Sequence, residues 1–217
     1  MSGLHADSIL KSYGDRTILS DVYLGCRTGE IVGLLGRNGC GKSTMLKIIF
    51  GALNAEYRFV RVDDKVQNKL SESSKLIKYL PQDSFLPNHI KVKTIIRLFC
   101  DPDNAAALYE HPLVSPFLES KSGELSGGEL RVFEILLIIH SSAKYILIDE
   151  PFNGVSPIYV EEIKKAIKSQ TATKGFIITD HSYRNILDIA DRIVLIHDQV
   201  LRHVKEENEL TYWGYTP

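Results

Sequence analysis

The order of apolar and polar positions divides the first part of the chain into strand-like and helix-like segments. Residues 8–35 have the pattern of short strands and are interrupted by turn-forming residues at 13–15 and 28–30. Within them, residues 31–35 form an apolar run that ends directly in a glycine-rich stretch. Residues 43–53 then carry apolar side chains at helical spacing. The pattern predicts antiparallel strands followed by a buried strand, a loop and a helix.

Strands and helices alternate in the rest of the chain. Strands are predicted at residues 57–62, 76–80, 145–148, 176–179, 193–196 and 199–204, and helices at 129–140, 158–169 and 183–190. This alternation predicts a largely parallel sheet covered on both faces. Residues 81–124 are polar and rich in proline, with short helical or irregular pieces at 94–99 and 112–118. We expect one domain over residues 1–217, with its core at about 1–81 and 125–217 and a small inserted lobe at about 82–124.

Composition and charge narrow the class of protein. The 217 residues are 44% hydrophobic and 24% charged, as in ordinary globular proteins. A formal net charge of -1 gives no broad basic surface, so we expect no nucleic-acid partner. No segment approaches the ~20 apolar residues that cross a bilayer, and the first residues lack a secretory pattern. We expect the chain to stay in the cytoplasm and to meet a membrane only through another subunit.

The cysteines do not suggest a framework of disulfides. Cys26, Cys40 and Cys100 are widely separated and odd in number, which also argues against a metal site with paired spacing. Cys40 lies inside the glycine-rich stretch, where it is either a redox-sensitive thiol or a small loop filler. We interpret it as the filler.

Residues 36–44 match the phosphate-loop pattern G-x-x-x-x-G-K-[ST] between a predicted strand and a predicted helix. Glycines let backbone N–H groups converge on anionic oxygens, and the helix adds the positive end of its dipole. Lys42 is expected to reach the β and γ phosphates, Ser43 to ligate Mg²⁺, and Thr44 to steady the phosphates. The stretch therefore predicts nucleoside triphosphate binding by Gly36, Asn38, Gly39, Cys40, Gly41, Lys42, Ser43 and Thr44.

Two adjacent carboxylates follow a buried strand later in the chain. Four apolar residues place Asp149 at the carboxyl end of that strand, where open α/β sheets gather their ligands. Asp149 is expected to hold Mg²⁺, through a water. Glu150 is a candidate general base for the attacking water; alternatively it caps the segment that follows.

Residues 125–129 read Leu-Ser-Gly-Gly-Glu and lie between these two motifs. In this order the three segments resemble the ATP-binding cassette (ABC) family. The resemblance implies an α/β fold: a P-loop NTPase core with a mostly parallel sheet, an N-terminal antiparallel β subdomain and a small inserted helical lobe. It also implies that Glu150 is the general base and that subunits pair head to tail. Ser126, Gly127 and Gly128 of one subunit would then contact the ATP held by the other.

The resemblance assigns three further site residues. Gln82 matches the family's glutamine loop, which implies contact with Mg²⁺ and the attacking water, although a lone Gln after Pro is also a common surface turn. His181 matches the switch histidine, which implies a hydrogen bond to the γ-phosphate, the alternative being a purely structural histidine. Tyr13 lies where family members carry an aromatic residue that stacks on adenine, or else it covers the core.

The function implied by the resemblance is that of an ATP-binding and ATP-hydrolysing subunit of an ABC transporter. It would form a homodimer, or pair with another ABC ATPase subunit, around two Mg-ATP and drive a separate permease at the inner face of the cell membrane. Ser156 stands where the family usually has an aspartate that links the two sites. The alternatives are a soluble ABC ATPase of the iron–sulfur assembly type and a weakly hydrolysing nucleotide sensor.

Apolar residues after Gln82 supply either a permease-docking surface or the lobe's own core, namely Phe85, Leu86, Pro87, Ile90 and Val92.

Overall fold

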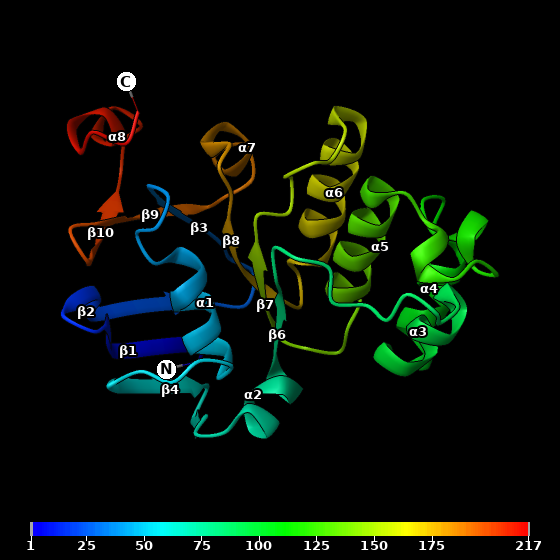
Figure 1. The fold of residues 1–217 in the computed structure, drawn as a ribbon, viewed down its shortest axis with the longest axis horizontal. Helices are drawn as coiled ribbons and strands as arrows, with labels where there is room; N and C mark the ends of the chain where they lie inside the picture. Colours follow the sequence, from blue (N-terminus) through cyan, green and yellow to red (C-terminus); the bar gives the residue numbers. More distant parts are fainter. Residues whose placement is uncertain (1, 217) are drawn as a thin grey trace.

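The computed structural model describes residues 2–216, and a six-stranded sheet forms the centre of the fold (Figure 1). The strands lie in the order β10 (Val200–Val204), β9 (Arg192–His197), β3 (Ile31–Gly36), β8 (Gly175–Thr179), β7 (Tyr145–Asp149) and β6 (Ile77–Leu80). All neighbours are parallel except β10 and β9. The parallel strands therefore present their carboxyl ends along one edge, as the alternation of strands and helices predicted.

A second, antiparallel sheet is built from the first part of the chain. Its order is β2 (Arg16–Cys26), β1 (Leu4–Tyr13), β4 (Tyr57–Val62) and β5 (Lys65–Val66). The N–H of Ser20 in β2 donates to the carbonyl of Gln199, 2.9 Å away, beside β10. This bond joins the antiparallel sheet to an edge of the central sheet.

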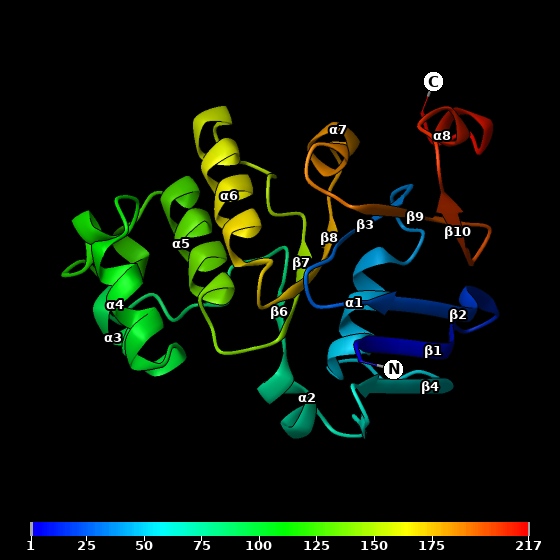
Figure 2. The ribbon, with the colours of Figure 1, turned by 180° about the vertical axis from the view of Figure 1, so that it is seen from behind.

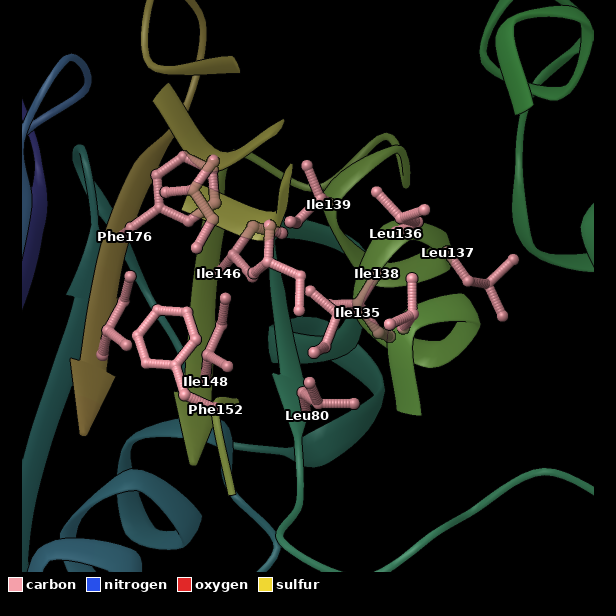
Figure 3. Close-up of a cluster of buried hydrophobic side chains, with 14 of the residues drawn as sticks. Leu80, Ile135, Leu136, Leu137, Ile138, Ile139, Ile146, Ile148, Phe152 and Phe176 are labelled. Atoms are coloured by element: carbon pink, nitrogen blue, oxygen red, sulfur yellow. The ribbon is translucent and has the colours of Figure 1, made fainter. Parts of the chain in front are cut away.

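Helices cover both faces of the central sheet (Figures 1 and 2). The helix α1 (Lys42–Phe50) lies toward the antiparallel sheet, whereas α5 (Gly127–Ile139), α6 (Pro157–Gln170) and α7 (Tyr183–Leu187) lie on the opposite side. Figure 3 shows Ile146 and Ile148 of β7 directed toward the isoleucine and leucine side chains of α5. Within residues 2–216, no helix has both the length and the apolar character needed to cross a bilayer.

Alternate residues of the strands enter two separate cores. Val32 and Leu34 of β3 pack with α1 and the antiparallel sheet. Ile31 and Leu35 of the same strand belong to the larger core that includes α5 and α6. Because successive side chains of a strand point to opposite faces, a strand made almost entirely of apolar residues serves both cores.

The inserted segment contains more helix than the sequence predicted. The helix α3 (Val92–Phe99) agrees with the expectation, but α4 (Pro102–Glu110) was missed, and only Ser115–Phe117 and Ser122–Glu124 are 3₁₀ turns. Asp101 starts α4 because its Oδ1 accepts a hydrogen bond from the N–H of Asn104, 3.0 Å away, and Pro102 suits the first turn.

One strand boundary was wrong, and burial favours one of the two alternatives that the sequence left open for the residues after Gln82. Residue 76 is not in a strand, because Leu76 ends the short polar helix α2 (Leu70–Leu76), which has no continuous apolar face. The proposed docking surface after Gln82 is largely core: Val92 is fully buried, Leu86 is 6% exposed, and Phe85 and Ile90 pack against the same cluster. These side chains therefore hold the lobe together.

Residues 213–215, which include Trp213 and Tyr215, pack beside the phosphate loop. They follow α8 (Asn208–Tyr212), and the carbonyl of Gly214 accepts a hydrogen bond from the guanidinium of Arg37. The ring of Trp213 lies 5.3 Å from that of His197, and the ring of Tyr215 lies 6.2 Å from that of Tyr183. The end of the chain thus covers the outer side of the loop that follows β3.

Candidate functional site: a nucleotide pocket at the carboxyl edge of the sheet

The loops that follow β3, β6, β7 and β8 surround a hollow of about 380 Å³ at the carboxyl edge of the central sheet. Residues from sequence positions as far apart as 13 and 181 meet there. The hollow is lined by Tyr13, Ile18, Asn38, Gly39, Gly41, Lys42, Ser43, Thr44, Gln82, Glu150 and His181. Apart from Ile18, each of these was a candidate from the sequence.

Glycines inside the phosphate loop adopt backbone conformations that residues with a side chain avoid. Gly39 and Gly41 have φ angles of 74° and 112°. A Cβ on Gly41 would also lie 2.7 Å from Cγ2 of Ile18, too close for a side chain. The N–H of Met45 makes an intrahelical bond to the carbonyl of Gly41, so the N–H groups before it remain available to a ligand at the helix end.

Lys42 places its ammonium group inside this loop. The side chain is 6% exposed, and Nζ donates hydrogen bonds to the carbonyls of Gly36 at 2.7 Å and Arg37 at 3.4 Å. These carbonyls are neutral, so they do not balance the positive charge of the buried ammonium group. The loop is therefore prepared for an anionic ligand such as a phosphate group.

Cys40 behaves as a small loop residue. Burial raises the pKa of its thiol above the ordinary value, which opposes formation of the reactive thiolate. The structure therefore favours the loop-filler interpretation over a redox-sensitive thiol.

The carboxylate of Asp149 is fixed by two hydroxyl groups. The residue is 1% exposed; Thr179 Oγ1 donates to Oδ1 at 2.8 Å, and the Tyr79 hydroxyl donates to Oδ2 at 3.0 Å. Burial, together with the nearby negative charge of Asp149, raises the pKa of Tyr79, so its hydroxyl remains a proton donor. Sequence reasoning missed Tyr79 as a site residue, and its place three residues before Gln82 was the only signal.

Glu150 has an unusual backbone conformation. Its φ of 51° lies in the left-handed region, and its N–H donates to the carbonyl of Thr179 at 2.9 Å. The side chain is 7% exposed, with Oε1 2.8 Å from Nε2 of His181. Oε2 is buried and has no hydrogen-bond partner among residues 2–216. An unpartnered buried carboxylate oxygen beside the pocket suits a group that accepts a proton from a bound water.

Tyr13 and Gln82 line the same pocket from its outer side. Tyr13 ends β1 and is 52% exposed, so it does not serve mainly to cover the core. Gln82 is exposed, lies just beyond β6 and lines the hollow. Both positions agree with their candidate roles in ligand binding.

Ser126 begins α5 away from this pocket. Its hydroxyl accepts a hydrogen bond from the N–H of Glu129 at 3.4 Å, and the Glu129 carboxylate accepts one from the N–H of Ser126 at 2.8 Å. Ser126 and Gly127 are exposed. Apart from adjacent residues and the backbone of α5 itself, no atom of residues 2–216 lies within 4 Å of where a Cβ on Gly127 or Gly128 would lie. These three residues therefore form an open surface that does not contribute to the pocket of its own chain.

Comparison with known proteins shows one family. The model of the family described as ABC transporter matches residues 19–153. The chain is 34% identical to the lipopolysaccharide export system ATP-binding protein LptB of Haemophilus influenzae, covering 90% of this chain and 87% of the relative. It is 35% identical to a probable ABC transporter ATP-binding protein of Azorhizobium caulinodans, over 89% of this chain and 74% of that relative.

Solved structures show the same fold. An ATP binding subunit of an ABC transporter has a TM-score of 0.85 at 20% identity, covering 99% of this chain and 94% of that structure. A nucleotide-free ATP-binding cassette from an ABC transporter has a TM-score of 0.82 at 23% identity, and the match covers 100% of this chain and 96% of that structure.

The fold and site define a nucleotide-binding cassette, and the chain belongs to the ABC transporter family. It is an ATP-binding subunit of a transporter and an ATPase. This agrees with the leading interpretation of the sequence, not with the iron–sulfur assembly or sensor alternatives.

Proposed function

We propose that two copies of this chain, or one copy and another ABC ATPase subunit, enclose two Mg-ATP and drive a separate permease. The observation that carries the proposal is the convergence of four loops on one pocket, with Lys42, Glu150 and His181 all lining it. The lobe at about 82–124 would be the part that meets the permease, which would hold the chain at the inner face of the membrane.

ATP fits this pocket through three kinds of contact. The ring of Tyr13 offers an exposed face for adenine, since aromatic faces accept any base by stacking. Backbone N–H groups of residues 42–44, at the start of α1, would donate to the phosphates. Lys42 then exchanges its carbonyl partners for β- and γ-phosphate oxygens, which supply the negative charge that the carbonyls lack.

The residues around the phosphate end of the pocket also fit Mg²⁺. Ser43, Gln82 and Asp149 would supply oxygen atoms, which are the ligands that this hard cation prefers. Asp149 suits contact through a water, because both of its oxygens already accept a hydroxyl hydrogen bond. When bound, Mg²⁺ neutralises charge on the β- and γ-phosphates.

Hydrolysis is assigned to Glu150 and His181. The free Oε2 of Glu150 accepts a proton from the attacking water, a role that typically contributes ~10² to 10⁴ in rate. Nε2 of His181 contacts Oε1 and so sets the direction of the carboxylate. The residue also lines the pocket, and its ring would give up this contact to donate to the γ-phosphate when ATP is bound.

The partner subunit completes the site. Ser126, Gly127 and Gly128 lie on an open surface outside their own pocket, which is the arrangement required if they act on ATP held by another subunit. Ser156, at the start of α6, replaces the aspartate expected between the two sites, so we propose weaker coupling between them. The permease would determine which substrate is transported. Several relatives are named lipopolysaccharide export system ATP-binding protein, so lipopolysaccharide is the first substrate to examine.

Glu150→Gln and Ser126→Asn test this proposal. Glu150→Gln should abolish turnover while retaining Mg-ATP, and should accumulate dimers measurable by light scattering. Ser126→Asn keeps a good N-cap but adds bulk at the open surface, so it should reduce both the dimer and turnover. Ser169→Ala, on the exposed side of α6, is the control. A Glu150→Gln protein that stays monomeric in saturating Mg-ATP, with normal turnover in Ser126→Asn, would refute the dimer mechanism.

A further inference from the structure

Two charged residues are buried in the helix α5, whose residues after the first turn are otherwise apolar. Arg131 is 8% exposed and Glu134 is 1% exposed, and Arg131 Nη1 lies 3.7 Å from Glu134 Oε2. Burial lowers the pKa of Arg131 and Glu134 opposes that shift, as expected for a cation removed from water and paired with a carboxylate. Such a buried pair is weak as a source of stability, so its contacts suggest another role.

The guanidinium of Arg131 connects two of the loops that form the pocket. Nη1 donates to the carbonyl of Pro81 at 2.7 Å, directly before Gln82. Nη2 donates to the carbonyls of Asp149 at 2.8 Å and Glu150 at 3.2 Å. A planar guanidinium holds these acceptors in a fixed arrangement, which the single ammonium of a lysine does not reproduce.

Glu134 binds the other side of the Gln82 loop. Its Oε1 accepts hydrogen bonds from the Ser84 hydroxyl at 2.6 Å and from the N–H of Phe85 at 3.1 Å. The ring of Phe85 lies 6.0 Å from that of Phe99 in α3. The loop is therefore held on both sides of Gln82, and its far end is packed into the lobe.

The backbone of Glu150 depends on these contacts. Its φ of 51° is unfavourable for a residue with a side chain, so surrounding bonds have to maintain it. The carbonyl of Thr179 holds its N–H, and Arg131 holds its carbonyl. Without the Arg131 contact, the bond from the N–H of Glu150 to Thr179 would remain, but the carbonyl of Glu150 would lose this donor.

We propose that Arg131 and Glu134 are positioning residues that couple the loop at residues 81–85 to the backbone of Glu150. The proposal rests on the proposed role of Glu150 as general base. A displacement of the lobe at Phe85 reaches Glu134, then Arg131, and then the peptide that orients the Glu150 carboxylate. The same pair belongs to the helix that Ser126 begins, so the open surface of that helix moves with it.

Arg131→Met, Arg131→Lys and Ser84→Ala test the proposal in the purified full chain. Lys164→Met is a matched control, because Lys164 on the neighbouring helix α6 is also buried, at 6% exposed, and does not line the pocket. It pairs with the carboxylates of Glu161 and Asp188, each 2.9 Å away. For each variant, kcat, the Kd of Mg-ATP and the melting temperature are measured. Arg131→Met should lower kcat about 10²-fold, as expected for a displaced catalytic group, with Kd nearly unchanged. Arg131→Lys should recover only part of the loss.

Ser84→Ala changes an exposed residue and keeps the proposal testable if Arg131→Met does not fold. It should lower kcat without lowering the melting temperature, and its effect should not add to that of Arg131→Lys, because both act through one chain of contacts. Unchanged kcat in Ser84→Ala and Arg131→Lys, additive effects, or an equal loss in Lys164→Met would overturn the proposal. Absence of Mg-ATP hydrolysis by the unmodified chain would instead refute the function on which it rests.

Discussion

The Nε2 atom of His181 lies 2.8 Å from Oε1 of Glu150, although the two residues follow different strands. The contact leaves Oε2 of Glu150 as the free oxygen at the pocket. One ring nitrogen therefore occupies Oε1 of the carboxylate, which would leave Oε2 for the attacking water, and His181 also lines the pocket in which the γ-phosphate is proposed to lie.

The first prediction concerns this contact. His181→Ala should retain Mg-ATP binding, because Lys42 and the phosphate loop are unaffected, but should lower kcat by about 10²-fold through misplacement of Glu150. Steady-state ATPase measurements and a binding titration separate the two effects. The control is His203→Ala, an exposed histidine on β10. Normal kcat in His181→Ala would show that the contact is incidental.

The second prediction concerns the hydroxyl groups around Asp149. Tyr79→Phe removes the donor to Oδ2 and should raise the Mg²⁺ concentration needed for half-maximal ATPase activity by about 10- to 100-fold, the usual effect of losing a partner of a metal-binding group. Activity is measured against free Mg²⁺ at saturating ATP. Tyr57→Phe, at a 68% exposed position on β4, should leave that concentration unchanged. An identical Mg²⁺ dependence in both variants would contradict the assignment of Asp149.

The third prediction is that the thiols of the folded chain react slowly. Burial raises the pKa of Cys100 to about 11 and also raises those of Cys26 and Cys40. A raised pKa lowers the thiolate fraction at pH 8 below that of an unfolded cysteine, so iodoacetamide labelling should be slow until the pH rises or the chain unfolds. Mass spectrometry of the folded and urea-unfolded chain measures the difference. Equal labelling of Cys40 in both states would restore the redox-sensitive interpretation.

The fourth prediction concerns the core beneath the site. Ile146 is fully buried between β7 and α5, so Ile146→Ala should reduce the free energy of unfolding by about 2–5 kcal/mol through lost burial and a residual cavity. Ile158 is 77% exposed on α6, so Ile158→Ala should change the free energy of unfolding by less than about 0.5 kcal/mol. Urea denaturation followed by circular dichroism gives both values, and equal losses would place Ile146 outside the core.

The elements with a continuous apolar pattern were predictable from the sequence. The strands β3, β7 and β8 are buried along their whole length, so the residues before their carboxyl ends are almost all apolar and the signal is strong. The helices α2 and α4 were missed because they bury few side chains, including Ser73 in α2 and Ala105 and Leu108 in α4. Short helices of this kind depend on caps and neighbours, which leave little periodicity in the sequence.

The site residues supplied by motifs were also predictable, whereas those supplied by packing were not. Lys42 and Asp149 lie in local patterns, and the structure brings them to the same edge of the sheet. Tyr79 and Arg131 act across long separations, 70 residues in the first case and 50 for the bond from Arg131 to Pro81. A local sequence pattern does not indicate a partner so many residues away in the chain.

The amino-acid sequence by itself determined the family, the alternating fold and the residues expected to touch ATP, because backbone periodicity and the spacing within a phosphate loop are local properties. The tertiary structure decided which hydroxyl groups fix Asp149, which oxygen of Glu150 is free, and which apolar residues after Gln82 are core and not surface. Each of these depends on contacts between segments far apart in the chain, and such contacts exist only after the strands have assembled.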